Sequence, residues 1–210
     1  MPRRLRPRRR GRSSAALAGL GAVYLVVLVI GLATAPQGAP IPDPWFTLME
    51  GLILLIAPLM VAMMADIHAE AAPVARTGAL LAVAFMTVAA ALTSAVHFSI
   101  LALSRTPPFT DAAWSSVFAF EWPSVVYAID ILAWDGFFPL ALLCAAPAVR
   151  SRLIRRLLLL AAALALIGLL GPVLGRMDIR NIGILGYAVV FPVAAALYAF
   201  RSPGSASTGA

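Results

Sequence analysis

Long uninterrupted runs of apolar residues dominate the chain. A bilayer core about 30 Å thick requires about 20 apolar residues per helix, and six stretches meet that length. We expect them at about residues 15–35, 44–65, 77–104, 123–149, 157–175 and 181–200. None shows the sustained apolar–polar alternation that a membrane β-strand requires. The pattern therefore predicts an all-α fold, an integral membrane bundle of six transmembrane helices, because a helix satisfies its own backbone groups within lipid.

The composition excludes an ordinary soluble domain. Hydrophobic residues make up 62% of the 210 residues and charged residues only 12%, whereas about a quarter of the residues of a soluble domain are charged. A single cysteine, Cys144, excludes an intrachain disulfide framework and a site with several cysteine ligands. The chain carries no Walker loop, dinucleotide fingerprint or H-E-x-x-H motif. We therefore expect no cofactor and no metal.

The net charge of +7 comes from arginines, whose placement predicts the topology. Seven of the 16 lie within residues 1–12, which we interpret as a basic cytoplasmic tail rather than as a nucleic-acid-binding segment. With both termini cytoplasmic, 13 of the 16 fall on the cytoplasmic side, in agreement with the positive-inside rule. We expect residues 13–201 to form the transmembrane domain of a multi-pass protein of the plasma (bacterial inner) membrane. Residues 202–210, rich in Ser, Gly and Ala, are expected to be a disordered tail.

The first apolar stretch has some features of a cleaved signal peptide. Arginines precede it, and Ala33-Thr34-Ala35 resembles a cleavage site. Its apolar length of about 20 residues exceeds the 7–15 of a typical signal sequence. We therefore expect a retained helix.

The segment 104–121, between the third and fourth spans, is too apolar for a solvated loop. It contains Phe109, Trp114, Phe118 and Phe120, and Trp122 follows directly. Tryptophan and phenylalanine favour the membrane interface. The segment is expected either to lie on that interface or to cover a cavity as a lid.

Four ionisable residues fall well inside the predicted spans: Glu50, His97, Asp130 and Asp135. Each costs about 2.5–3.5 kcal/mol or more to insert, so each is a candidate functional residue. Counting from the span ends places the first three about two turns below the outer surface, with Tyr187 of the sixth span at a similar depth. We therefore predict a site in the outer half of the bundle. Three further residues are expected at its rim: Glu121, Trp122 and Asn181.

Helical spacing places Asp130 in an aromatic stripe. Tyr127, Trp134 and Phe137 share its face, and we expect these side chains to contact the substrate. Apolar surroundings penalise the charged form of a carboxyl. A carboxyl that stays neutral can donate a proton, and aromatic faces can stabilise a cation. Alternatively, Asp130 bonds a neighbouring helix or an arginine and only holds the bundle together.

Asp135 is expected to be rotated by about 140° from Asp130, so the two carboxyls do not face one cavity. It is either a proton relay or a structural hydrogen-bonding group. His97 shares a face with Thr93 and Ser94. It is either a satisfied hydrogen-bonding group or the partner of Glu50 in an acid–base pair.

Two charged segments outside the predicted site carry weaker signals. The run from Asp66 to Glu70 includes His68 and has an H-x-E spacing, but it stands alone at the inner end, where we expect no metal. The turn with Arg176, Asp178 and Arg180 is either a solvated, internally paired loop or a site for an anionic headgroup or diphosphate.

The buried carboxyls, the histidine and the aromatic stripe together resemble the small integral-membrane terpene cyclases and, less closely, the emopamil-binding-type sterol isomerases. The resemblance rests on Glu50 in an early span, Asp130 in a later one and the neighbouring Trp134. It implies a membrane-embedded enzyme that protonates a lipophilic, isoprenoid-like substrate and guides carbocation cyclisation or isomerisation. Asp130, Glu50 and His97 would be the catalytic residues.

Two other functions stay open. Intramembrane Asp135, together with Pro58, Pro139 and Pro192, suits a small proton-coupled transporter whose helices move. A non-catalytic membrane interaction subunit would use the polar groups only to hold its helices together. The expected partners are a lipophilic small molecule or lipid and the bilayer, and the sequence leaves homo-oligomerisation open.

Overall fold

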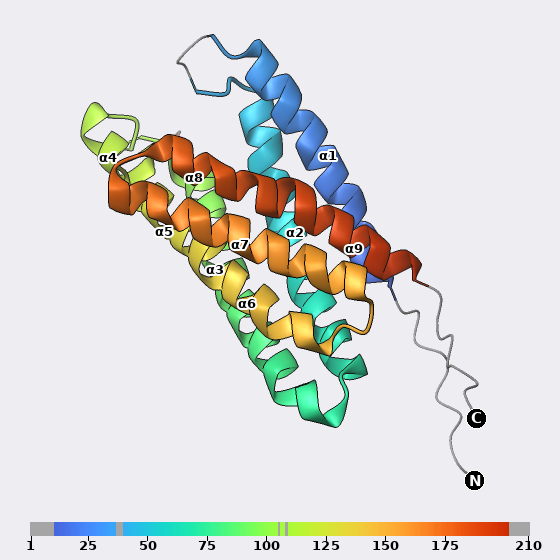
Figure 1. Cartoon of the computed structure of the whole chain (residues 1–210). Helices are drawn as coiled ribbons and strands as arrows, with labels where there is room; N and C mark the ends of the chain where they lie inside the picture. Colours follow the sequence, from blue (N-terminus) through green and yellow to red (C-terminus); the bar gives the residue numbers. More distant parts are fainter. Residues whose placement is uncertain (1–10, 37–39, 105, 108, 202–210) are drawn as a thin grey trace, which may run out of the picture.

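The structure is a computed structural model that describes residues 11–36, 40–104, 106–107 and 109–201. Within these residues the chain is a bundle of helices without a strand (Figure 1). Six helical segments are long and apolar enough to cross a membrane, which confirms the predicted fold class to that extent. The predicted basic tail, apart from its last two residues, and the predicted tail 202–210 lie outside the described residues.

Three of the six segments, the first, second and fifth, are single α-helices. The third is one α-helix with a short 3-10 turn ahead of it. The single helices are α1 (Arg12–Thr34), α2 (Trp45–Glu70) and α7 (Arg152–Leu174). In the third segment α3 (Arg76–Leu103) follows the turn Pro73–Ala75. Ser151 caps the start of α7 by accepting a hydrogen bond from the backbone of Ile154. Gly175 ends that helix in the left-handed conformation, with a φ of 65°, where glycine is favoured.

The fourth and sixth segments are each divided by a π-helical turn. The fourth runs through α5 (Val125–Ile131), the π turn Leu132–Phe137, α6 (Phe138–Ala145) and a 3-10 turn (Ala146–Ala148). The sixth runs through α8 (Met177–Ile184), the π turn Leu185–Val190 and α9 (Phe191–Phe200). Two short helices, Ala112–Trp114 and α4 (Ser115–Phe118), lie between the third and fourth segments.

Proline explains the position of both π turns. Pro139 and Pro192 each stand at the second residue of the α-helix that follows the turn. A proline has no N–H, and its ring clashes with the carbonyl group four residues earlier. A locally wider turn relieves that clash and shifts the angular position of the residues within it.

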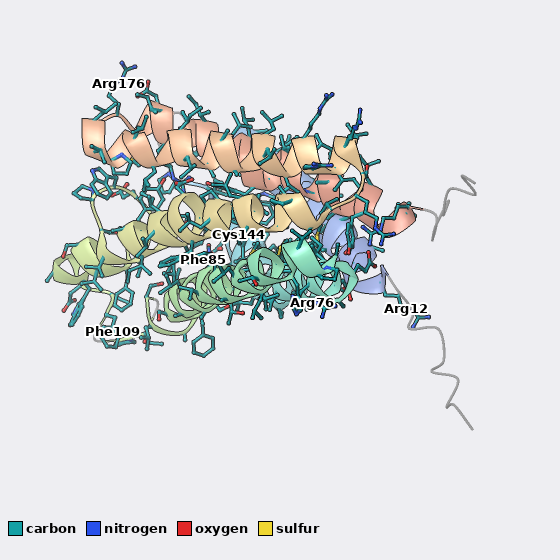
Figure 2. The ribbon with its side chains drawn as sticks, turned by 60° about the horizontal axis from the view of Figure 1, so that its bottom comes forward. Arg12, Arg76, Phe85, Phe109, Cys144 and Arg176 are labelled. Carbon is teal, nitrogen blue, oxygen red and sulfur yellow. The ribbon has the colours of Figure 1, made fainter. Side chains whose placement is uncertain are left out.

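The helices pack so that the first and last segments lie side by side. α1 contacts α2 and α9, α2 contacts α3, and α7 contacts α6 and α8. The start of α1 and the end of α9 meet, because a Cβ added at Gly11 would lie 2.9 Å from the carbonyl oxygen of Ala199. Figure 2 shows Arg12 and Arg76 at one end of the bundle and Phe109 and Arg176 at the other.

Polar contacts connect α1 and the end of the last segment to α2, at the end of the bundle that carries Arg12. Ser13 donates a hydrogen bond to Asp66 over 2.8 Å, and Arg201 pairs with Glu70. Two acidic residues of the H-x-E run therefore connect helices. Over the described ranges, no group of three or more His, Cys, Asp or Glu side chains is placed to hold a metal ion.

Candidate functional site

A cavity of about 740 Å³ lies between the first and last segments of the bundle. Its walls are mainly apolar and run along α1 from Leu17 to Leu32 and along α2 from Phe46 to Met60. At 1.5 Å per residue, these stretches correspond to a length of roughly 20 Å. Small-molecule sites have volumes of about 300–1,000 Å³. The cavity therefore has the size and lining for an elongated lipophilic molecule.

Four buried ionisable side chains from four different elements line this cavity: Glu50, His97, Asp130 and Arg180. His97 Nδ1 lies 2.7 Å from Glu50 Oε2, and its Nε2 lies 3.3 Å from Asp130 Oδ1. Asp130 Oδ2 in turn lies 3.5 Å from Nη2 of Arg180. The three predicted catalytic residues are thus brought together, in a continuous chain of ionisable groups that ends in an arginine.

Hydrogen bonds from α3 and the first π turn hold Asp130 in place. Trp134 Nε1 donates to the hydroxyl of Thr93 over 2.9 Å, and that hydroxyl donates to Asp130 Oδ1 over 3.3 Å. The Trp134 ring lies 4.9 Å from that of Tyr187, centroid to centroid. Thr93 therefore links the aromatic wall of the cavity to the carboxylate.

Of the seven residues predicted to bind the substrate, five line the cavity and two do not. Tyr127, Trp134 and Tyr187 line the cavity, as do Glu121 and Asn181 at its solvent-exposed rim. Trp122 is 40% exposed and is not part of the lining. Phe137, predicted on the face of Asp130, instead packs against Phe85 of α3 and does not line the cavity. It lies at the end of the π turn, where the helical spacing used in the prediction no longer applies.

Asp135 approaches the same arginine as Asp130. It is fully buried, and its Oδ2 lies 3.6 Å from Nε of Arg180. The expected rotation of 140° assumed an unbroken α-helix, and the π turn between the two residues changes it. Only Asp130 lines the cavity, whereas Asp135 points toward the contact between α7 and α8.

The sequence places Arg180 in a charged turn outside the membrane, either as part of a solvated, internally paired loop or as a site for an anionic group, whereas the structure buries it. Arg176 and Asp178 do form an exposed pair, with a separation of 2.6 Å. Arg180 follows within α8 and is only 4% exposed. The signal that could have found it is Gly171, because a Cβ there would lie 2.6 Å from the Arg180 backbone nitrogen. A glycine opposite the helix start lets α8 approach α7 closely enough to bury its polar side chain.

The buried cluster contains more carboxyl groups than cationic groups. Glu50, Asp130 and Asp135 face at most two positive charges, those of Arg180 and a protonated His97. An unbalanced buried charge is costly. Electrical neutrality of this cluster therefore requires a proton on at least one of the three carboxyl groups.

The loop before α5 covers one end of this cluster. Phe120 contacts His97 and Tyr127, with ring centroids 5.6 Å and 5.0 Å apart. Ala119, Phe120 and Glu121 belong to the cavity wall. This part of the loop has the geometry of a cap. Three other aromatic residues of the loop, Phe109, Trp114 and Phe118, pack against one another.

A second, smaller cavity of about 220 Å³ adjoins the first at the seam between α1 and the last segment. Gly21, Ala188 and Pro192 line both cavities. Gly21 and Pro192 are in close contact, because a Cβ at Gly21 would lie 3.1 Å from the proline ring. Residues with small side chains thus form part of the wall of both cavities.

The close contact between α7 and α8 gives a testable packing prediction. A Cβ at Gly183 would lie 2.5 Å from Oδ1 of the fully buried Asp135. Gly183→Ala is therefore expected to lower the free energy of unfolding by about 1–3 kcal/mol, measured by denaturation in detergent. Gly51→Ala on α2 is the matched control, because a Cβ there meets nothing within 4 Å. It should stabilise its helix slightly, and equal losses in both variants would contradict the packing described here.

Comparison with known proteins gives no family assignment. No protein-family model matches the chain, and no curated protein or solved structure gives a significant match. The functional argument therefore depends on the cavity and its buried cluster.

Proposed function

We propose that this protein is a membrane-embedded enzyme that isomerises or cyclises a lipophilic, isoprenoid-like substrate by proton transfer. The observation that carries the proposal is the position of His97 between Glu50 and Asp130, two carboxyls that both line the cavity. Such a reaction takes a proton from one carbon and returns a proton to another. It therefore needs an acid and a base that exchange roles, without a net change in protons.

An imidazole between two carboxyls suits that exchange. One ring nitrogen can accept a proton while the other releases one. The contact of Nδ1 with Glu50 is short, at 2.7 Å. The contact of Nε2 with Asp130 is longer, at 3.3 Å, and such contacts in unliganded sites tighten when substrate binds. A proton can then pass along the path Glu50–His97–Asp130.

Arg180 changes the role proposed for Asp130. The sequence suggested that Asp130 donates a proton from an aromatic environment. Asp130 is the cavity carboxyl that lies against a fixed cation, with 3.5 Å between its Oδ2 and Nη2 of Arg180. We therefore assign Asp130 as the base and the Glu50–His97 pair as the store of the proton that is returned.

The cavity walls support a lipophilic substrate. They are mainly apolar and extend from the cluster along α1 and α2. Gly21, Ala188 and Pro192, which line both cavities, mark the route that we propose for entry from the bilayer. The placement of the arginines favours a multi-pass protein of the plasma membrane with its N-terminus in the cytoplasm. The cluster then lies in the outer half of the bilayer.

Deuterium incorporation tests the proposal. The full-length protein in lipid vesicles is incubated in D₂O with farnesene, farnesol and farnesal, which share an isoprenoid chain and differ in the head group. We expect protein-dependent deuterium at carbon in at least one probe, detected by mass spectrometry. Asp130→Asn and Glu50→Gln should abolish it. Asp178→Asn, which changes an exposed carboxyl outside the cavity, should not. Failure of the wild-type protein to label any probe would overturn the proposal, as would full activity in both cavity variants.

A further inference from the structure

The guanidinium of Arg180 is buried in the cavity but weakly engaged by the protein. Its contacts with Asp130 and Asp135 are 3.5 Å and 3.6 Å long, whereas charge-assisted hydrogen bonds between nitrogen and oxygen measure about 2.7–2.9 Å. Nε has no hydrogen-bond partner within the part of the chain that the structure describes. A guanidinium has five N–H donors in a planar fork. Buried donors without acceptors are costly, so this group is poised for an acceptor on a ligand.

The surrounding side chains fix the guanidinium without satisfying its donors. The rings of Tyr127 and Tyr187 lie 5.0 Å and 5.9 Å from its central carbon. Cation–π contacts of this kind hold a cation in position and leave the N–H groups at its edge free to bond. Nε is buried beside Asp135. Because Arg180 lines the cavity, its terminal Nη groups are the donors that can reach a molecule inside it.

The charge balance selects a neutral oxygen acceptor. Two acidic side chains already lie beside Arg180, so a fully anionic head group would compete with them for a single cation. A carbonyl oxygen accepts hydrogen bonds and adds no net charge. A carbonyl also becomes negative when a neighbouring carbon loses a proton, and a positioned arginine stabilises that negative charge. The same fixed positive charge disfavours a carbocation beside it.

We infer that the substrate is a lipophilic α,β-unsaturated carbonyl compound whose oxygen is bound by Arg180, and that the intermediate is an enolate. This inference rests on the proposed proton-transfer function and narrows its substrate class. Asp130, next to Arg180, takes a proton from the carbon γ to the carbonyl. The electrons of the broken C–H bond form a new C=C bond between the β and γ carbons, and the electrons of the original C=C bond move between the α carbon and the carbonyl carbon. The C=O π electrons then become the negative charge on the oxygen at Arg180.

The cycle closes without an oxidant or a reductant. A proton from the Glu50–His97 pair returns to the α carbon, which restores the C=O bond and leaves the C=C bond in its new position. The proton on Asp130 passes to His97 and Glu50, which restores the starting state. Atoms and electrons balance, because substrate and product are isomers.

A pair of probes and a charge-balanced variant test this inference. Farnesal carries the conjugated carbonyl, and farnesene is a hydrocarbon with a similar chain. Because Arg180→Met alone leaves two carboxylates without their cation, we use Arg180→Met with Asp135→Asn. Asp135→Asn alone is the matched control, since Asp135 does not line the cavity. The melting temperature of each variant in detergent verifies that it is folded.

We expect the wild-type protein and Asp135→Asn to bind farnesal more tightly than farnesene and to lower the carbonyl stretching frequency of bound farnesal. The double variant should lose about tenfold in farnesal affinity, keep its farnesene affinity and lose the infrared shift. An unchanged preference for farnesal, or an equal loss for both probes, overturns the inference.

Deuterium labelling separates this inference from the proposed function. If the protein prefers farnesal through Arg180 but does not label it with deuterium, the carbonyl-binding site is supported and the proposed enzymatic function is refuted. If farnesene is labelled as fast as farnesal, and the double variant labels both at the same rates as the wild-type protein, the proposed enzymatic function is supported and the carbonyl-binding site is refuted.

Discussion

Arg180→Met is expected to lower the free energy of unfolding by about 3–5 kcal/mol, the cost of removing one partner from a buried ion pair. The side chain is 4% exposed and lies between Asp130 and Asp135, two carboxyls that are themselves buried. Its removal leaves them without a cation, so each must either take up a proton or remain as an unpaired charge. Unfolding in mild detergent, followed by tryptophan fluorescence, measures the loss.

The same turn of the chain supplies a matched control. Arg176 pairs with Asp178 at 2.6 Å, but both side chains are almost two-thirds exposed. Water solvates both partners, so Arg176→Met should change stability very little. Adding Asp135→Asn to Arg180→Met should recover part of the loss, because it removes one uncompensated carboxylate. Similar effects of the two arginine substitutions would contradict a buried, bridging Arg180.

His97→Asn is expected to slow deuterium incorporation into the responsive probe by about 10²–10⁴-fold, the usual contribution of a positioned acid–base group. Asparagine keeps a polar side chain between Glu50 and Asp130 but cannot pass a proton at neutral pH. The folded protein should therefore still bind the probe while the transfer path is broken. Binding and labelling are measured on the same vesicle preparation.

The other histidine of the chain is the control for this substitution. His68 lies near the end of α2, at the level of Asp66 and Glu70, and does not line the cavity. His68→Asn should label the probe at the wild-type rate. If His97→Asn also labels within a few-fold of wild type, His97 serves only to join α2 to α3, and the proton path assigned to it is wrong.

The fold class could be predicted because hydrophobic length is a strong constraint in lipid. A stretch of about 20 apolar residues has few alternatives to a spanning helix, and the structure has six helices of that kind. Depth along a helix could be counted in the same way. Glu50, His97 and Asp130 were therefore expected at one level, and the structure brings them into contact.

The direction in which a side chain points around its helix was harder to predict than its depth along the helix. The two π turns shift the helical register where the site lies, so the expected position of Phe137 assumed a geometry that the chain does not keep. Asp135 nevertheless stays out of the cavity that Asp130 lines, as expected. Pro139 was visible in the sequence, but a proline can cause a kink, a break or a wider turn. The burial of Arg180 could not be predicted for another reason: it depends on the approach of α8 to α7 at Gly171, a contact between two helices.

The seam between α1 and the last segment has a consequence for how this protein would meet its substrate. Gly21, Ala188 and Pro192 line both the main cavity and the smaller one beside it. If molecules enter there, the acyl chains of the surrounding lipids compete for the same opening. The effective substrate concentration is then a mole fraction within the bilayer, independent of the volume of water around the vesicles. Half-saturation would follow the ratio of substrate to lipid, and lipids with bulkier or more ordered chains would change it without touching a catalytic residue.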